Sequence, residues 1–118
     1  MKKVLFILTL LLFYIGIFSQ NNVQESQFQQ IKNEIENIKK EIPVQITPEN
    51  INQAVQKYLK IGHLYTQIND ADNAQISFEK VISLDNTNDK AYFMLGLIYE
   101  KKKMYSQAID AWQKCILY

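Results

Sequence analysis

Cysteine, histidine, arginine and glycine are scarce or missing in this 118-residue chain, and each shortage excludes a class of site. The single cysteine, Cys115, has no partner for an intramolecular disulfide or a cysteine metal cluster. The single histidine, His63, has only Asp70 and Asp72 near it in sequence, a spacing that matches no known metal motif. The three glycines are isolated, which excludes a glycine-rich phosphate loop, and no serine or cysteine has a recognisable base partner. We therefore predict no enzyme activity and no cofactor.

The charge balance narrows the class of partner. The chain has no arginine, and its 13 basic residues oppose 12 acidic ones. Removal of Lys2 and Lys3 with an N-terminal leader would leave 13 − 2 = 11 lysines against 12 acids, a net charge near −1. Binding to nucleic acid phosphates needs a basic field, so we expect a protein or peptide partner and no nucleic acid.

The first nineteen residues have the pattern of a secretory signal peptide. Lys2 and Lys3 form a positive start, Val4 to Phe18 is a run of 18 − 4 + 1 = 15 mostly apolar residues, and Ser19 is a small residue after it. A membrane span needs about 20 apolar residues, so this run is short for one. We predict cleavage after Ser19 and an exported protein, periplasmic or secreted. The alternative is an uncleaved membrane anchor formed by residues 4–18.

A thin apolar seam follows in the polar segment of residues 20–47. Its members recur at alternating spacings of three and four, as in a heptad: Phe28, Ile31, Ile35, Ile38 and Ile42. A short amphipathic helix is marginal alone in water, so the seam needs a partner. Three arrangements would supply one: stacking on the following domain as a cap, lying in that domain's groove, or pairing with the same helix of another chain as a coiled coil.

Proline positions mark the next boundary. Pro43 ends the amphipathic helix, and Thr47 then resembles an N-cap with Pro48 at the first helical position. The pattern predicts a helix from near Pro48 to about Ile68. We therefore place a helical domain over residues 48–118.

Two similar halves of this domain are related by a constant offset along the chain, here called the repeat shift. It is the offset from Gly62 to Gly96, 96 − 62 = 34. The same offset aligns Tyr58 with Tyr92, Leu64 with Ile98, Tyr65 with Tyr99, Ala74 with Ala108, Phe78 with Trp112, and Ile82 with Ile116. Glycine inside a helix costs about 1 kcal/mol against alanine. Two glycines at matched positions therefore indicate close helix packing, with Phe78 and Trp112 filling the space that they leave.

These residues and this period resemble the tetratricopeptide (TPR) repeat family. The resemblance covers roughly residues 55–118, with one repeat at about 55–88 and a second at 89–118. It implies an all-α fold, an α-solenoid of two helix–turn–helix hairpins preceded by one amphipathic helix. Asn69-Asp70 suits the turn of the first hairpin, whereas Lys102-Lys103 in the second is less typical of a turn.

Members of this family bind ligands on a concave face, formed mainly by the first helix of each repeat. The resemblance places these residues there: Gln56, Leu59, His63, Thr66 and Gln67 in the first repeat, and Lys90, Phe93, Leu97, Glu100 and Lys101 in the second. Repeats that grip a peptide carboxylate have lysine and asparagine where this chain has Leu59 and His63, so that clamp is absent. We expect an apolar strip of Leu59, Phe93 and Leu97. Either an amphipathic helix or apolar peptide binds it, or the chain's own N-terminal helix covers it.

The last helix carries a second candidate interface. Trp112, Ile116, Leu117 and Tyr118 lie where a next repeat would stack, and exposed apolar patches of this kind mark interfaces. We expect a second copy of the chain, or another protein, to bind there. Cys115 either fills a small packing position on this helix or pairs with a second chain.

The function that follows is a non-catalytic, exported protein–protein interaction module. Two alternatives remain at this point. One is a small oligomeric structural component of the envelope, held together by the isoleucine helix. The other is a membrane-anchored adaptor with its repeats outside the membrane.

Overall fold

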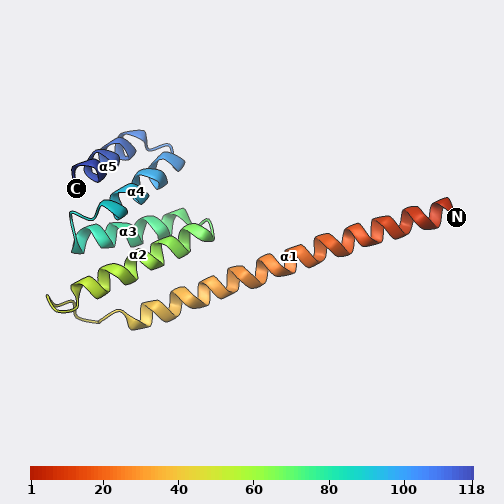
Figure 1. Cartoon of the computed structure of the whole chain (residues 1–118), viewed down its shortest axis with the longest axis horizontal. Coiled ribbons are helices and arrows are strands. Elements are labelled where there is room, and N and C mark those ends of the chain that lie inside the picture. Colours follow the sequence, from red (N-terminus) through yellow and green to blue (C-terminus); the bar gives the residue numbers. More distant parts are fainter. The chain divides into compact units, whose positions relative to one another are not determined.

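The computed structural model describes all residues from 1 to 118 as an all-helical chain without strands. Its five helices are α1 (Lys2–Glu41), α2 (Ile51–Gln67), α3 (Ala71–Leu84), α4 (Asp89–Lys101) and α5 (Tyr105–Leu117). The chain divides into two compact units, Met1–Glu34 and Ile35–Tyr118. Within the second unit, α2, α3, α4 and α5 pack one on the next in chain order (Figure 1). The fold class is therefore all-α and consistent with an α-solenoid, as the sequence predicts.

The first unit is helical from Lys2 onward, and its apolar side chains between residues 4 and 18 are exposed. Among the five helices only α1 has the length and apolar composition to cross a membrane, a test that signal sequences also meet. The helix runs through Ser19 without a break, so the predicted leader and the amphipathic segment form one helix of 40 residues. Phe28, the first residue of the seam, remains 38% exposed.

The end of α1 belongs to the second unit and packs there as a cap. Ile35 and Ile38 are buried, with 1% and 7% of their surface exposed. Beside them, the Lys39 ammonium donates a hydrogen bond of 3.0 Å to the Tyr65 hydroxyl, which lies on α2. Lys57, also on α2, pairs with Glu41 at 2.5 Å. Of the three arrangements considered for the isoleucine seam, residues 35–41 therefore adopt the one in which the helix stacks on the following domain as a cap.

The start of α2 differs from the prediction. Thr47 does not cap the helix, which begins at Ile51 after a turn at residues 47–50. The Asn50 side chain accepts a hydrogen bond of 2.8 Å from the Thr47 backbone N–H. The Thr47 hydroxyl instead bonds Glu49 and, as the largest cause, lowers the pKa of that carboxyl. Because its hydroxyl is used locally, Thr47 supports the turn and not the helix terminus.

The two hairpins, α2–α3 and α4–α5, close with the same turn. Asn69 and Lys103, which are related by the repeat shift, both adopt the left-handed conformation, with φ of 61° and 60°. In the first turn the Asp70 N–H donates to the Tyr65 carbonyl at 2.9 Å, and the equivalent bond in the second turn is 2.8 Å. This is the hydrogen bonding of a Schellman motif, which satisfies the last carbonyls of a helix. Lys102-Lys103 therefore forms as regular a turn as Asn69-Asp70.

Close packing at the two glycines is confirmed. A Cβ atom on Gly62 would lie 2.7 Å from Cζ of Phe78, which is fully buried between α2 and α3. A Cβ atom on Gly96 would lie 2.8 Å from Cε2 of Trp112 and closer still to other indole atoms. Each large side chain of a second helix thus rests on the bare backbone of the first helix.

Candidate protein-interaction surfaces

One member of the predicted concave strip is not available to a ligand. Leu59 is only 5% exposed because it points, with Val55 one turn earlier, into the core cluster around Phe78. Its assignment to an exposed strip is therefore wrong. Phe93 and Leu97 on α4 are exposed, at 49% and 40%, so the apolar part of this face lies on α4 alone.

The polar members of the predicted face are exposed on α2 and α4: Gln56, His63, Thr66, Gln67, Lys90, Glu100 and Lys101. Three members of the face come together, because Thr66, Leu97 and Lys101 line a cavity of about 100 Å³. Binding sites for small ligands are typically about 300–1,000 Å³, so this cavity suits a single side chain. His63 is not among its lining residues, and its ring packs edge-on against Phe78 with the centroids 5.3 Å apart.

The second predicted interface lies on α5. We call the exposed apolar side chains at this end of the domain the C-terminal patch: Tyr105, Ile109, Ile116, Leu117 and Tyr118, each between 53% and 87% exposed. Trp112 is different, since its indole is half-buried against Gly96 and belongs to the α4–α5 packing. The Tyr118 ring also stacks on Tyr92, with the centroids 5.8 Å apart. The Cys115 thiol is half-buried and makes no disulfide within the chain.

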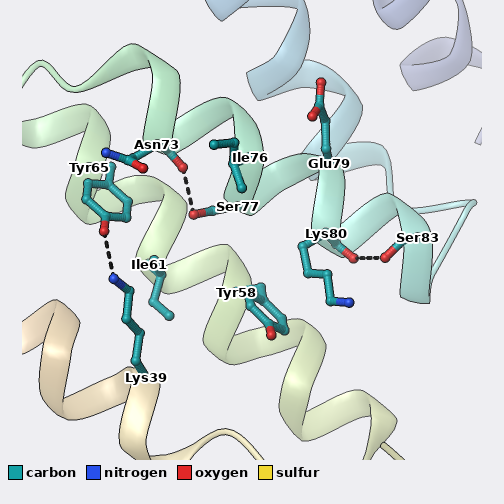
Figure 2. Close-up of a pocket in the computed structure, with 10 residues that line it drawn as sticks. All are labelled: Lys39, Tyr58, Ile61, Tyr65, Asn73, Ile76, Ser77, Glu79, Lys80 and Ser83. Atoms are coloured by element: carbon teal, nitrogen blue, oxygen red, sulfur yellow. Dashed lines mark hydrogen bonds between the residues drawn. The ribbon is translucent and has the colours of Figure 1, made fainter.

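A larger groove, here called the first groove, lies between the end of α1, α2 and α3 (Figure 2). Its cavity volume of about 460 Å³ is in the range of ligand-binding sites. Its lining includes two tyrosines, two isoleucines and two lysines, together with four other polar residues: Lys39, Tyr58, Ile61, Tyr65, Asn73, Ile76, Ser77, Glu79, Lys80 and Ser83. The groove is thus apolar at its base, with ammonium groups at its edges.

A second groove of about 360 Å³ lies between α3, α4 and α5. It is the counterpart of the first groove under the repeat shift, since its lining residues Tyr92, Leu95, Tyr99, Asp110 and Lys114 correspond to Tyr58, Ile61, Tyr65, Ile76 and Lys80. The walls correspond as well. The end of α1 bounds the first groove where α3 bounds the second. The end of α1 therefore stands in for the second helix of a preceding hairpin.

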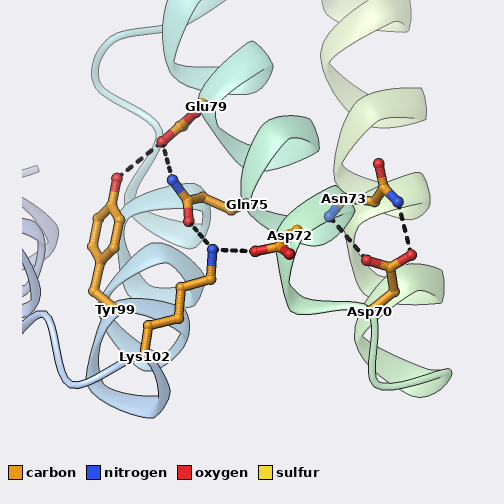
Figure 3. Close-up of polar contacts among 7 residues, drawn as sticks. All are labelled: Asp70, Asp72, Asn73, Gln75, Glu79, Tyr99 and Lys102. Carbon is orange, nitrogen blue, oxygen red and sulfur yellow. Dashed lines mark hydrogen bonds and ion pairs between the residues drawn. The ribbon is translucent and has the colours of Figure 1, made fainter.

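Polar contacts join α3 to α4 beside the second groove (Figure 3). The Tyr99 hydroxyl donates to Glu79 at 3.0 Å, and Gln75 donates to the same carboxylate oxygen at 2.7 Å. Lys102 donates to Gln75 at 2.7 Å and pairs with Asp72 at 2.5 Å. Burial, with Glu79 next, raises the pKa of Tyr99 to about 12. This network fixes the second hairpin on the first.

Sequence reasoning missed both grooves. The signal was present in the four tyrosines, because Tyr58 and Tyr65 recur as Tyr92 and Tyr99. Their role in a groove becomes visible only when Lys39 and α3 are known to form the walls. No three His, Cys, Asp or Glu side chains lie close enough together to hold a metal ion.

A comparison with protein families matches residues 12–116 to the C-terminal ARM domain of tetratricopeptide repeat protein 21. The chain belongs to this family. The matched stretch begins within the apolar run of α1 and extends into α5. A comparison with curated proteins gives no match.

Membership places the chain among helical-repeat relatives of TPR proteins. Domains of this kind typically mediate protein interactions and are generally non-catalytic. The surfaces described above are therefore candidates for binding protein partners. Four are distinguishable by position: the exposed face of α4, the first groove, the second groove and the C-terminal patch.

Proposed function

We propose that this protein is an exported, non-catalytic interaction module built from two tandem TPR repeats, α2–α3 and α4–α5. It self-associates through the C-terminal patch. The two-repeat organisation is supported by the repeat shift, which relates the turns, the glycine contacts and the grooves.

The proposal rests mainly on a comparison of α3 with α5. Side chains of α3 hold the following hairpin in place, whereas the side chains at the equivalent positions of α5 are exposed. On α3, Gln75 accepts a hydrogen bond from Lys102, the residue directly after α4, Glu79 accepts one from Tyr99 on α4, and Ile82 packs against the core cluster. Their counterparts under the repeat shift are Ile109, Gln113 and Ile116, and all three are exposed. Two of these three are large and apolar, which favours an interface over a solvated face.

A second copy of the chain fits this surface because α5 offers no net charge to oppose it. Asp110 and Lys114 pair with each other at 3.0 Å, so their charges are balanced on the helix. Two C-terminal patches can therefore approach without the cost of an unpaired charge in an apolar interface. We expect a dimer at micromolar concentration.

Light scattering of the full chain in detergent micelles measures this association. Leu117→Glu and Tyr118→Glu should weaken the dimer because each places a carboxylate in the patch. Val44→Glu is the matched control, since Val44 is a fully exposed apolar residue in the segment between α1 and α2. A chain that stays monomeric, or a dimer that ignores both patch substitutions, refutes the proposed surface.

Export is supported by Lys2, Lys3 and the exposed apolar side chains of residues 4–18. We propose cleavage after Ser19, with a membrane-anchored adaptor as the alternative. Intact-mass analysis of the exported form should show a chain that starts at Gln20. Recovery of the full-length chain from the membrane fraction would establish the anchored form instead.

A further inference from the structure

The two grooves differ at the pair of positions that sets their charge. In the second groove Asp110 pairs with Lys114, one turn later on α5, at 3.0 Å. In the first groove the residue equivalent to Asp110 is Ile76, so Lys80 has no carboxylate one turn before it. The Lys80 ammonium makes no hydrogen bond or ion pair in the chain, and Lys80 lines the groove from α3 while Tyr58 lines it from α2 (Figure 2).

The tyrosine hydroxyls of the two grooves differ in the same way. In the second groove Tyr92 donates its hydroxyl hydrogen to the Asn86 carbonyl at 3.0 Å. The equivalent hydroxyl of Tyr58 has no partner in the chain. No buried side-chain polar atom lacks a partner, so the Tyr58 hydroxyl is open to solvent. In the first groove the Lys80 ammonium and the Tyr58 hydroxyl are thus donors without an acceptor. In the second groove the equivalent groups of Lys114 and Tyr92 each have one.

The surroundings of these donors are apolar, and Lys80 is the one lysine of the lining whose ammonium is not paired. Ile61 forms part of the buried base of the groove, and Ile76 is 62% exposed beside it. Of the two lysines in the lining, Lys39 pairs with Glu36 at 2.8 Å, which leaves Lys80 as the unpaired cation, and Glu79 is the one acid of the lining. The Glu79 carboxylate already accepts hydrogen bonds from Gln75 and Tyr99 on its far side.

We propose that the first groove binds a peptide segment of a partner protein that presents a carboxylate beside a large apolar side chain. The carboxylate accepts hydrogen bonds from the Lys80 ammonium and the Tyr58 hydroxyl, and the apolar side chain packs on Ile76. Hydrogen bonds to an ionised carboxylate are roughly twice as strong as neutral ones. The proposal rests on the function of the chain in protein binding, but it uses a surface separate from the C-terminal patch.

The test uses the full chain in detergent micelles and two blocked tetrapeptides, acetyl-Leu-Phe-Glu-Leu-amide and its glutamine analogue. Methyl NMR signals of Ile61 and Ile76 report binding. The glutamate peptide should bind about fivefold more tightly than the glutamine peptide, as expected for an exposed charge pair. Higher salt should reduce this difference.

Matched variants assign the effect to one ammonium group. Lys80→Met should remove the preference for glutamate, whereas Lys114→Met, the same change in the second groove, should leave it intact. Ile76→Asp places a carboxylate one turn before Lys80, as Asp110 stands before Lys114, and should abolish binding of the glutamate peptide. The same peptide is compared across variants, so its partition into micelles cancels.

Equal affinity for the two peptides, or a preference that survives Lys80→Met, overturns the proposal. The dimer measured in the same samples separates this failure from failure of the proposed function. A dimer that depends on the C-terminal patch, without peptide binding, leaves the proposed function standing and removes only the groove. If neither the dimer nor peptide binding is observed, both the proposed function and the groove proposal are refuted.

Discussion

Gly62→Ala tests how rigidly the first hairpin is packed. The added Cβ would lie 2.7, 2.8 and 2.9 Å from three ring atoms of Phe78, closer than real side chains approach. Phe78 has no exposed surface and belongs to the core cluster, so its ring has no free space into which to move. Overpacking of this kind costs about 1–3 kcal/mol, and we expect the upper end.

Helix propensity acts in the opposite direction. Alanine in place of glycine gains about 1 kcal/mol in a helix interior. The net loss for Gly62→Ala is therefore about 2 kcal/mol, which lowers the Tm of a domain of this size by about 8–16 °C. Circular dichroism of the full chain during heating measures this change.

Gly96→Ala provides the informative contrast. Its Cβ would overlap Trp112 more deeply, but Trp112 is half-buried and its indole can move toward solvent. We expect a net cost of about 0–1 kcal/mol, smaller than at Gly62. Gly16→Ala is the control, since no atom lies within 4 Å of the added group. An unchanged or higher Tm for Gly62→Ala, or a larger loss at Gly96, would show that this packing argument is mistaken.

Three further predictions concern the cap, the second turn and the α3–α4 network. Ile35→Ala should lower the free energy of unfolding by about 2–5 kcal/mol because it leaves a cavity, whereas Phe28→Ala should change it little; urea unfolding compares them. Lys103→Asn should raise stability by about 1 kcal/mol because asparagine tolerates the left-handed conformation, and Asn69→Lys should reverse the effect. Because the pKa of Tyr99 rises from 10.0 to about 12, its protonated form is favoured in the folded state. This contribution to the free energy of unfolding is complete below pH 10 and is lost as the pH rises to about 12. The free energy of unfolding of Tyr99→Phe should therefore fall less steeply with pH across this range than that of the unmodified chain.

The helix content and the glycine contacts were predictable from sequence because their signals are local or periodic. The repeat shift relates Gly62 to Gly96 and Phe78 to Trp112, and the contacts of those four residues follow from it. The left-handed turn at Lys103 was harder to foresee, since lysine has no preference for that conformation. The hydrogen bonds to the terminal carbonyls of α4 hold the turn even with lysine at this position.

The candidate surfaces were less accessible to sequence reasoning because they depend on which helices cover one another. Leu59 was assigned to an exposed strip by analogy with other repeats, yet its neighbours in the core enclose it. The first groove requires that Lys39 reach Tyr65, a contact across 26 positions in the chain. The isoleucine seam predicts that the helix packs against another apolar surface, but the sequence does not specify which surface, because several would bury the same side chains equally well.

Each groove has a tyrosine at the same repeat position, Tyr65 in the first and Tyr99 in the second, and this bears on how many hairpins such a domain can contain. The Tyr65 hydroxyl accepts a hydrogen bond from a lysine, and the Tyr99 hydroxyl donates one to a glutamate. A phenol satisfies a neighbour of either charge without any change of side chain. A further hairpin carrying tyrosine at this position could be inserted between α3 and α4 without a compensating substitution at Glu79. Whole hairpins can in this way be added or removed during evolution or engineering, while the joint between them stays satisfied.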